Sequence, residues 1–354
     1  MLFYSNGNRY EGQFRYDKIE GHGIFFHFDG GKYEGQFKNN KREGFGVLYF
    51  PNGNRYVGQW KNNKIEGKGI LYYTDGKIYK GEFKNSLREG YGILYYQDGG
   101  RYEGEWKNNN REGYGLEYFQ NKISYEGDWK NNMIDWYGVS YYLNGDKYKG
   151  KLKNNKRNGY GICFFSNGGR YEGEFKDNKI EGNGIVFYSD GSKYIGEFKN
   201  NLKEGFGVRY YNSGNRYKGQ WKNNVIEGYG IFNYFNGSKY KGEFKNNTRN
   251  GYGIEYYTDG GSYEGDFRDN IREGYGIEYY HDKINYKDQW KNNALEGYGI
   301  LNYTDGGKYE GKFKNNKRDG YGIEYNIYGG RYEGEWNNHK CEGYGILYFL
   351  NGDR

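Results

Sequence analysis

The stretch YKGEFKNSLREGYGILYYQDGGR, residues 79–101, decides the fold because the chain repeats it throughout its length. Residues 240–262 read YKGEFKNNTRNGYGIEYYTDGGS, and six further copies lie between these two. A tyrosine recurs every 23 residues from Tyr10 to Tyr332, which gives fifteen repeats of 23 residues. Residues 1–9 match the end of a repeat and form a partial copy. A fixed period of this length is the sequence signature of a repeat architecture.

Numbering each repeat from its tyrosine shows which positions are fixed. Position 3 is Gly in fourteen repeats, position 12 is Gly in fourteen, and position 14 is Gly in all fifteen. Position 5 is Phe or Trp in fourteen repeats, and position 15 is Ile, Val or Leu in all. The exceptions are Asp288 at position 3, Leu152 at position 5 and Trp136 at position 12. We expect rings from adjacent hairpins to cover the backbone that these glycines leave open.

The polar and apolar residues alternate with a period of two, which is the period of a β-strand. Positions 1, 3 and 5 point one way and the charged positions 2, 4 and 6 point the other, while positions 13, 15 and 17 form a second apolar row. The sequence K-N-N separates the two runs, and N-G or D-G follows the second, which is turn chemistry. Each repeat is therefore predicted to be a β-hairpin.

The composition also favours an all-β repeat array. Only 34% of the residues are hydrophobic and the mean hydropathy is −1.21, but 21% are aromatic, which argues against disorder. One hairpin buries too little surface to fold alone, so stacking is required. We predict an all-β, single-layer, twisted antiparallel hairpin array without helices. Residues 10–354 would form one continuous rod on the order of 140 Å long at ~4.8 Å per strand.

The repeats resemble the MORN (membrane occupation and recognition nexus) repeat. The resemblance rests on YEGEWKNNNREGYGLEY at residues 102–118 and on its counterparts across residues 10–354. It implies an elongated, twisted, single-layer β structure that associates with itself. It further implies a cytoskeletal or membrane-apposed scaffold, an axonemal component, or a regulatory segment attached to an enzyme. Several members of this family have been proposed to bind phosphoinositides.

Position 10 carries a second pattern. Apolar and basic residues alternate there, and the alternation slips after Arg111 and after Arg272. The order of the first seven repeats returns in the next seven, which indicates duplication of a block of repeats. These basic residues are candidate contacts for anionic lipid, at ~1 kcal/mol per charge at most. The alternative is an ordinary solvated surface. The basic residues are Arg42, Arg88, Arg111, Arg157, Lys203, Arg249, Arg272 and Arg318.

Two segments depart from the repeat, and we predict local bends near residues 120–138 and 281–290. In both, the D-G turn is missing and is replaced by QNKIS or HDKIN, at equivalent places in the two copies of the block. Trp136 and Asp288, which replace glycines, follow these turns. Neutral drift copied by duplication is the alternative explanation.

The sequence favours a protein that is not an enzyme and has no cofactor or metal. The recurring G-x-G is followed by a strand, whereas a phosphate cradle needs a helix N-terminus. Four histidines occur without a nucleophile and a carboxylate at a convincing spacing. Cys163 and Cys341 are too far apart along a rod to form a disulfide. His339 and Cys341 would supply at most half of a zinc site, to be completed by another chain.

The net charge of +7 is spread over interleaved acidic and basic residues, which does not indicate a nucleic-acid binder. No apolar run approaches the ~20 residues that span a bilayer, and no targeting segment is visible. We therefore expect a cytoplasmic protein, at the cytoskeleton or the cytoplasmic face of a membrane. The last repeat is regular, so we expect the ends to continue in a longer chain or to pair with another chain.

The combined prediction is a scaffold in a cytoskeletal or submembrane assembly that acts through protein contacts and self-association. The first alternative is a module that binds anionic lipid such as phosphoinositide, or the regulatory segment of a larger enzyme. The second alternative is an axonemal structural component.

Overall fold

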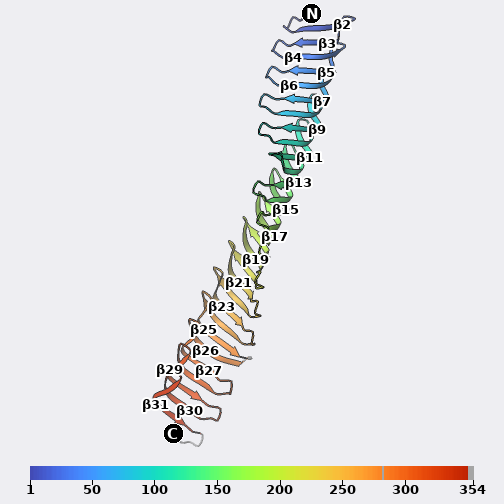
Figure 1. Cartoon of the computed structure of the whole chain (residues 1–354). Helices are drawn as coiled ribbons and strands as arrows, with labels where there is room; N and C mark the ends of the chain where they lie inside the picture. The colour runs from blue at the N-terminus through green and yellow to red at the C-terminus, as the bar shows by residue number, and fades with distance from the viewer. Residues whose placement is uncertain (281–282, 350–354) are drawn as a thin grey trace. The chain divides into compact units, whose positions relative to one another are not determined.

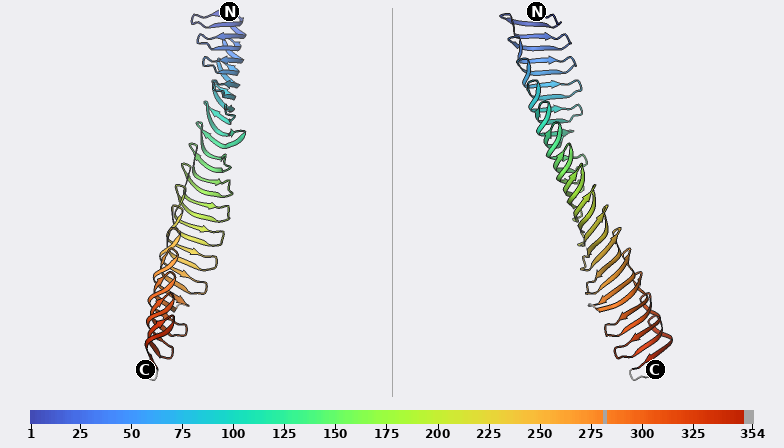
Figure 2. Two further views of the ribbon diagram at one scale, coloured as in Figure 1. Left: turned by 60° about the vertical axis from the view of Figure 1, so that its left-hand side comes forward. Right: turned by 180° about the vertical axis from the view of Figure 1, so that it is seen from behind.

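The computed structural model describes residues 1–280 and 283–349, and every regular element in these residues is a β-strand (Figure 1). The chain divides into two compact units, Met1–Lys179 and Ile180–Arg354. Within each unit, each strand pairs antiparallel with the next strand in the sequence, which gives one open sheet of successive hairpins (Figure 2). The predicted all-β hairpin array is confirmed. The single continuous rod stays a prediction.

The first unit contains the strands β1 to β16. Their bounds are β1 (Leu2–Phe3), β2 (Arg9–Arg15), β3 (Lys18–Phe26), β4 (Lys32–Lys38), β5 (Lys41–Tyr49), β6 (Arg55–Lys61), β7 (Lys64–Tyr72), β8 (Ile78–Lys84), β9 (Leu87–Tyr95), β10 (Arg101–Lys107), β11 (Asn110–Phe119), β12 (Lys122–Lys130), β13 (Met133–Tyr141), β14 (Lys147–Lys153), β15 (Lys156–Phe164) and β16 (Arg170–Lys176).

The second unit contains β17, which starts at the unit boundary, and the strands up to β31. Their bounds are β17 (Lys179–Phe187), β18 (Lys193–Lys199), β19 (Leu202–Tyr210), β20 (Arg216–Lys222), β21 (Val225–Asn233), β22 (Lys239–Lys245), β23 (Thr248–Tyr256), β24 (Ser262–Arg268), β25 (Ile271–Tyr280), β26 (Lys283–Lys291), β27 (Ala294–Asn302), β28 (Lys308–Lys314), β29 (Lys317–Tyr325), β30 (Arg331–Asn337) and β31 (Lys340–Tyr348).

The K-N-N turn inside each repeat is a two-residue turn in which both residues are left-handed. In β10–β11, for example, Asn108 has φ 47° and Asn109 has φ 69°. Positions 7 and 8 have positive φ in all fifteen repeats. Two-residue turns of this kind match the natural twist of antiparallel strands, and asparagine tolerates the conformation better than most residues. The repeated asparagines therefore specify the tight end of each hairpin.

The D-G turn that joins one repeat to the next is longer. In repeat 4, the Tyr96 amide donates to the Gly100 carbonyl at 2.9 Å, and the Gly99 amide donates to the Tyr96 carbonyl at 3.2 Å. Gly99 has φ 84°, a left-handed conformation that a residue with a Cβ rarely adopts. The Asp98 carboxylate accepts a hydrogen bond from the Gly100 amide at 2.9 Å. Both residue types of the D-G signal thus have a defined role in the turn.

The first predicted irregular segment differs from this pattern in its turn. Gln120 and Asn121, with φ 47° and 62°, form a two-residue turn between β11 and β12. The strand register shifts between Glu117 and Tyr118. The duplicated segment has the same shift between β25 and β26, but His281 and Asp282 lie outside the described residues. The bends themselves stay predictions.

Strand pairing divides the repeat positions between two faces of the sheet. Positions 1, 3 and 5 lie opposite positions 16, 14 and 10, as Tyr79, Gly81 and Phe83 lie opposite Leu94, Gly92 and Arg88. This face, with positions 1, 3, 5, 10, 14 and 16, is called the ladder face below. The other face carries the charged positions 2 and 4 together with positions 13, 15 and 17, and is called the mixed face. The second apolar row therefore lies among the charged residues.

The core of each unit is a row of aromatic rings on the ladder face. Tyr79 is fully buried, and its ring meets Phe83 of its own repeat edge to face, with centroids 5.2 Å apart. Trp106 of the next repeat meets the same tyrosine at 5.2 Å. Edge-to-face pairs contribute ~0.5–1.5 kcal/mol each beyond their buried area. The same contacts recur along both units, and at position 5 of repeat 7 the row holds the buried aliphatic Leu152.

The glycines make room for these rings. A Cβ added to Gly92 would lie 2.6 Å from Cε2 of Tyr79, closer than two carbon atoms can approach. The Tyr79 hydroxyl donates to the Glu82 carbonyl at 3.1 Å, and Nε1 of Trp106 donates to the Gly92 carbonyl at 3.2 Å. The prediction that rings cover the glycines is confirmed at positions 3 and 14. It is wrong at position 12, where Gly90 has positive φ and faces the Glu82 side chain. The tyrosine, however, covers the glycines of its own hairpin, and only the position-5 ring comes from the adjacent one.

Two residues that replace a glycine of the repeat keep a backbone conformation that favours glycine. Trp136 at position 12 has φ 92°, and Asp288 at position 3 has φ 147°. Conformations of this kind cost about 1–3 kcal/mol in a residue with a Cβ. Burial also raises the pKa of the Asp288 carboxyl, so its charged form is a second cost to the fold.

We predict that Asp288→Gly stabilises the second unit by about 1–3 kcal/mol at neutral pH, because it removes both costs. Asp288→Asn removes only the charge. Since the pKa is raised in the folded state, the wild type gains stability as the pH falls through that pKa, and the advantage of Asp288→Asn shrinks there. Urea unfolding at neutral and acidic pH measures both effects. A lower midpoint for Asp288→Gly than for the wild type would contradict the strain.

We predict that Gly92→Ala destabilises repeats 4 and 5 by roughly 1–3 kcal/mol, because the added methyl group displaces the Tyr79 ring. Tyr79→Phe is the matched comparison, since it removes one hydrogen bond of about 1 kcal/mol and keeps the ring in place. Amide hydrogen exchange in β8 to β11 reports the local loss. Unchanged exchange in Gly92→Ala would show that the ring does not need the glycine.

Candidate interaction faces of the array

The eight basic residues at position 10 all lie on the ladder face, where they pack against the aromatic row. The Cζ atoms of Arg88 and Arg318 lie 4.1 Å from the ring centres of Trp106 and Trp336. Nζ of Lys203 lies 4.9 Å from the ring centre of Trp221. Cation–π contacts of this kind contribute about 0.5–2 kcal/mol. Comparable contacts hold the other five residues, which are Arg42, Arg111, Arg157, Arg249 and Arg272.

Most of these guanidinium groups also hold the next repeat in place. Arg88 donates from Nη2 to the Asn109 carbonyl at 2.7 Å, and Arg157 donates in the same way to Asn178 at 2.7 Å. The acceptor is the second residue of the following K-N-N turn. Position 10 thus links successive turns along one edge of the array, and its cation has a structural role that requires no membrane. Lipid contact by these residues stays a prediction.

Four of the eight basic residues have a carboxylate partner at position 16 of the same repeat. Arg249 pairs with Glu255 at 2.6 Å, and Arg111 pairs with Glu117 at 3.1 Å. The arginine side chains in these pairs are only 15–19% exposed. The remaining pairs are Arg272 with Glu278 and Arg318 with Glu324. Half of the positive charges at position 10 are therefore neutralised within the ladder face.

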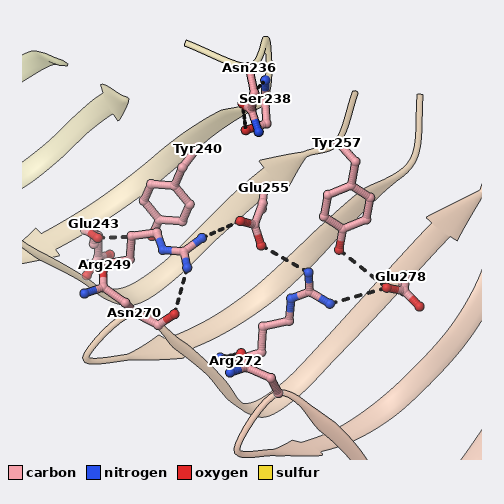
Figure 3. A network of polar contacts seen from close by, with 11 residues as sticks. Asn236, Ser238, Tyr240, Glu243, Arg249, Glu255, Tyr257, Asn270, Arg272 and Glu278 are labelled. Atoms are coloured by element: carbon pink, nitrogen blue, oxygen red, sulfur yellow. Dashed lines mark hydrogen bonds and ion pairs between the residues drawn. The ribbon is translucent and has the colours of Figure 1, made fainter. Parts of the chain in front are cut away.

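Repeats 11 and 12 join two of these pairs into a network (Figure 3). Glu255 accepts from Nη1 of Arg249 at 2.6 Å and from Nη2 of Arg272 at 3.1 Å. Arg272 also contacts Glu278 at 3.3 Å, to which the Tyr257 hydroxyl donates at 3.4 Å. The Glu255 carboxylate thus bridges arginines from consecutive hairpins.

Repeat 9 has a cation at both position 10 and position 16, the two positions that form an ion pair in repeats 11 and 12. Arg209 occupies position 16, and its Cζ lies 3.9 Å from the ring centre of Tyr188. Its Nη2 donates to the Ser192 hydroxyl at 3.0 Å. Burial, together with the charge of Arg209, lowers the pKa of Lys203 to about 8.

The mixed face presents a row of half-exposed aromatic rings at position 13. The aliphatic residues of position 15 lie beside this row, half-buried, and the acidic and basic residues of positions 2 and 4 surround it. A two-residue turn pairs position 6 with position 9, so the sequence already implies that positions 13, 15 and 17 lie on the face opposite the tyrosines. The row comprises Phe45, Tyr91, Tyr114, Tyr137 and Tyr160 in the first unit and Phe206, Tyr229, Tyr252, Tyr275, Tyr298 and Tyr321 in the second, each between 46% and 57% exposed.

The row is interrupted in repeat 8, where Asn183 stands at position 13, and in repeat 3, where Lys68 stands there. A groove of about 490 Å³ opens at the gap in repeat 3. Phe45 and Tyr91 line it on either side of the interruption, and Val57 and Ile70 lie between them with glycine backbone. This groove combines apolar walls with the ammonium group of Lys68.

The remaining candidate sites of the sequence are scattered. Cys163 is buried beside Arg157, and Cys341 is exposed. His339 accepts a hydrogen bond from the Arg318 amide at 3.4 Å through Nδ1. Residues 1–280 and 283–349 contain no group of three or more histidine, cysteine or acidic residues that could hold a metal ion. The same residues contain no helix that could cross a membrane.

The paired glycines, the buried tyrosines and the two-faced hairpins define a repeat protein of stacked β-hairpins. The chain belongs to the MORN repeat family, whose model matches fifteen consecutive segments. The matched residues are 10–32, 33–55, 56–78, 79–101, 102–123, 125–147, 148–170, 171–193, 194–216, 217–239, 240–262, 263–283, 289–308, 309–326 and 332–354. Three matches end early, at residues 123, 283 and 326, where the turn sequence departs from N-G or D-G.

The comparison with solved structures gives matches of low sequence identity and low TM-score. The TCP10 domain of Danio rerio CPAP in complex with a peptide of Danio rerio STIL is 11% identical, with a TM-score of 0.24, and the match covers 78% of this chain and 97% of that one. The SAS-4 (dCPAP) TCP domain of Drosophila melanogaster, in complex with a proline-rich motif of Ana2, is 18% identical, with a TM-score of 0.22, and the match covers 51% and 85%. The comparison with curated proteins gives no match.

We predict that Arg209→Glu raises the pKa of Lys203 from about 8, because the new carboxylate would stabilise the ammonium group as Glu255 stabilises Arg249. The wild type should gain stability as the pH rises from about 8 towards 10.5, because the unfolded chain then holds the proton that the folded chain has lost. Arg209→Glu should lose most of this gain. A carbon-13 NMR titration of the lysine side chains measures the pKa, and a value near 10.5 in the wild type would contradict the burial of Lys203.

Proposed function

We propose that this protein is a non-enzymatic scaffold that organises a cytoskeletal or submembrane assembly through protein contacts and self-association. The proposal places it in the cytoplasm, at the cytoskeleton or at the cytoplasmic face of a membrane. Its mechanism is geometric, since each unit presents the same surface again with every repeat.

The observation that carries this proposal is the row of half-exposed aromatic rings on the mixed face. Tyrosine and tryptophan are enriched where proteins bind one another, because a rigid ring supplies contact area at low entropic cost. The row repeats at the spacing of one hairpin, about 9.5 Å at ~4.8 Å per strand. A partner with its own repeated or extended surface would meet several rings at once, which raises avidity without requiring a deep pocket.

The alternative is a module for anionic lipid, either alone or as the regulatory segment of a larger enzyme. Four basic residues on the ladder face of each unit support it. Their stacking on aromatic rings and their hydrogen bonds to the following turns reduce the charge that they offer to a membrane. An axonemal structural component is a special case of the scaffold and differs from it in localisation.

The scaffold predicts that changing the mixed face abolishes assembly while the fold is kept. We expect the triple variant Tyr91→Lys, Tyr114→Lys and Tyr160→Lys to fold, because repeat 3 naturally carries Lys68 at this position. It should lose at least tenfold in its recovery with the insoluble cytoskeletal fraction of cells that express the tagged chain, because each lost ring removes a contact of about 1–2 kcal/mol. Circular dichroism and amide exchange in the strands check the fold.

A matched control adds the same charge elsewhere. Phe28→Lys, Leu143→Lys and Tyr328→Lys change exposed turn residues, which are 75%, 88% and 74% exposed. This control should remain associated. If both triple variants dissociate equally, the added charge is the cause and the aromatic row is not the interface.

Liposome co-sedimentation separates the lipid alternative. Vesicles with and without phosphoinositide are mixed with the purified chain at low and physiological salt. The scaffold predicts no pelleting at physiological salt, because surface charges are screened beyond ~8 Å there. Pelleting that survives physiological salt and requires phosphoinositide would replace the scaffold by the lipid module.

A further inference from the structure

The duplication of the block of repeats places two versions of one site in the chain, and the first lacks a group that the second has. Arg249, Glu255 and Arg272 of the second copy correspond to Arg88, Leu94 and Arg111 of the first. Both copies therefore carry arginines in two consecutive hairpins. Only the second carries the carboxylate between them (Figure 3).

Without this carboxylate, Arg111 uses a different acceptor from Arg272, and Arg88 keeps the turn contact of Arg249 but lacks its contact with a carboxylate. Arg111 directs Nη2 to the Asn132 carbonyl at 3.0 Å, whereas Arg272 directs Nη2 to Glu255 at 3.1 Å. Arg88 donates from Nη2 to the Asn109 carbonyl at 2.7 Å. In the part of the chain that the structure describes, no carboxylate lies within ion-pair distance of Arg88. Its guanidinium group keeps Nη1 for another acceptor.

The first copy is also richer in positive charge around this point. Lys77 stands where the second copy has Ser238, and its ammonium group contacts the Asp75 carboxylate at 2.7 Å. Three cations, Lys77, Arg88 and Arg111, thus meet the carboxylates of Asp75 and Glu117. In the second copy two arginines meet two glutamates (Figure 3). The first copy therefore carries one uncompensated positive charge.

A pocket of about 310 Å³ lies at this place in the first unit. Lys77, Arg88 and Arg111 line it together with one carboxylate, that of Asp75. The other lining residues are Tyr73, Leu94, Tyr96, Trp106 and Asn132. Leu94 is 8% exposed and Trp106 is 3% exposed. The pocket thus holds three cations and the Asp75 carboxylate above a mostly buried apolar floor, and Arg88 is the cation without a carboxylate partner in the described part of the chain.

We propose that this pocket receives a glutamate or aspartate side chain from an acidic peptide segment of a protein partner. The incoming carboxylate would accept hydrogen bonds from Nη1 of Arg88 and from Nη2 of Arg111. The latter would turn to it from the Asn132 carbonyl, as Nη2 of Arg272 is directed to Glu255. The carboxylate would also face the ammonium group of Lys77. Its methylene groups would pack against Leu94 and Trp106. A phosphate group has no such methylenes, so the apolar floor favours the carboxylate of a side chain.

This inference rests on the proposed scaffold function, because it names the chemistry of one partner. It concerns the ladder face, whereas the assembly experiment above changes the mixed face. A failure of one is therefore distinguishable from a failure of the other.

The test uses the second copy as the template for a matched variant. Leu94→Glu installs the carboxylate that Glu255 provides, and the arrangement of repeats 11 and 12 shows that the fold accommodates it. The probes are N-acetyl-glutamate-N-methylamide and a fluorescent peptide of alternating glutamate and glycine. The indole N–H signal of Trp106 reports binding by NMR, because this ring stacks on Arg88 at 4.1 Å.

We expect the blocked glutamate to shift the Trp106 signal of the wild type and to saturate in the millimolar range, as for other small ligands. Leu94→Glu should weaken binding of both probes about tenfold or more, because its own carboxylate occupies the site. Lys77→Ser, which copies Ser238, should weaken binding severalfold and leaves the arginines intact. The Lys77→Ser variant provides a second test of the proposal if Leu94→Glu alters the fold.

Three results would overturn the proposal. The first is no saturable shift of the Trp106 signal in the wild type. The second is equal binding by the wild type, Leu94→Glu and Lys77→Ser. The third is binding of inorganic phosphate or of phosphoinositide vesicles at the same signal with no response to the glutamate probes, which would assign the site to a phosphate group.

Discussion

The whole array depends on one contact, the tyrosine ring of position 1 lying over the paired glycines of its own hairpin. Glycine at position 14 of every repeat, and at position 3 of every repeat but the thirteenth, lets the ring reach the backbone, as Tyr79 does over Gly81 and Gly92. The buried ring then offers its edges to two position-5 rings, one from its own repeat and one from the next. The packing within a hairpin and the packing between hairpins are thus made by the same side chain, which is why no repeat is independent of its neighbours.

The two faces of the sheet differ in how they use their charged and aromatic side chains. On the ladder face, the arginines contact groups of the same chain. Arg88 stacks on an aromatic ring, and Arg249 contacts a turn carbonyl and a carboxylate. On the mixed face, cations stack on the rings of position 17, as Arg9 stacks on Phe26 at 4.2 Å, while the position-13 rings stay half-exposed. Net charge is therefore a poor guide to the surface that a partner meets, because it counts both faces alike.

Much of the fold could be predicted because its rules are local. The period of two, the K-N-N and D-G turns and the glycine spacing all act within a single repeat, so the hairpin array follows from them. The partners of position 10 could not be predicted, because Arg88 meets its ring and its carbonyl acceptor in the next repeat. The turn at Gln120 and Asn121 was recognised as irregular, but its two-residue form depends on a strand register that the sequence does not state.

The pairing of each strand with the next in sequence also shapes how the chain folds. All the contacts that build a hairpin and dock it lie within about two repeats, so folding can begin anywhere and advance as the chain leaves the ribosome. The similarity of the repeats makes misdocking possible. A hairpin that skips its neighbour and docks on the following one meets nearly the same glycines and rings. Leu152 and the short turn at Gln120–Asn121 are places where such a skip would meet the wrong partner. The irregular repeats thus disfavour misdocked hairpins and so help to keep an otherwise uniform chain in register.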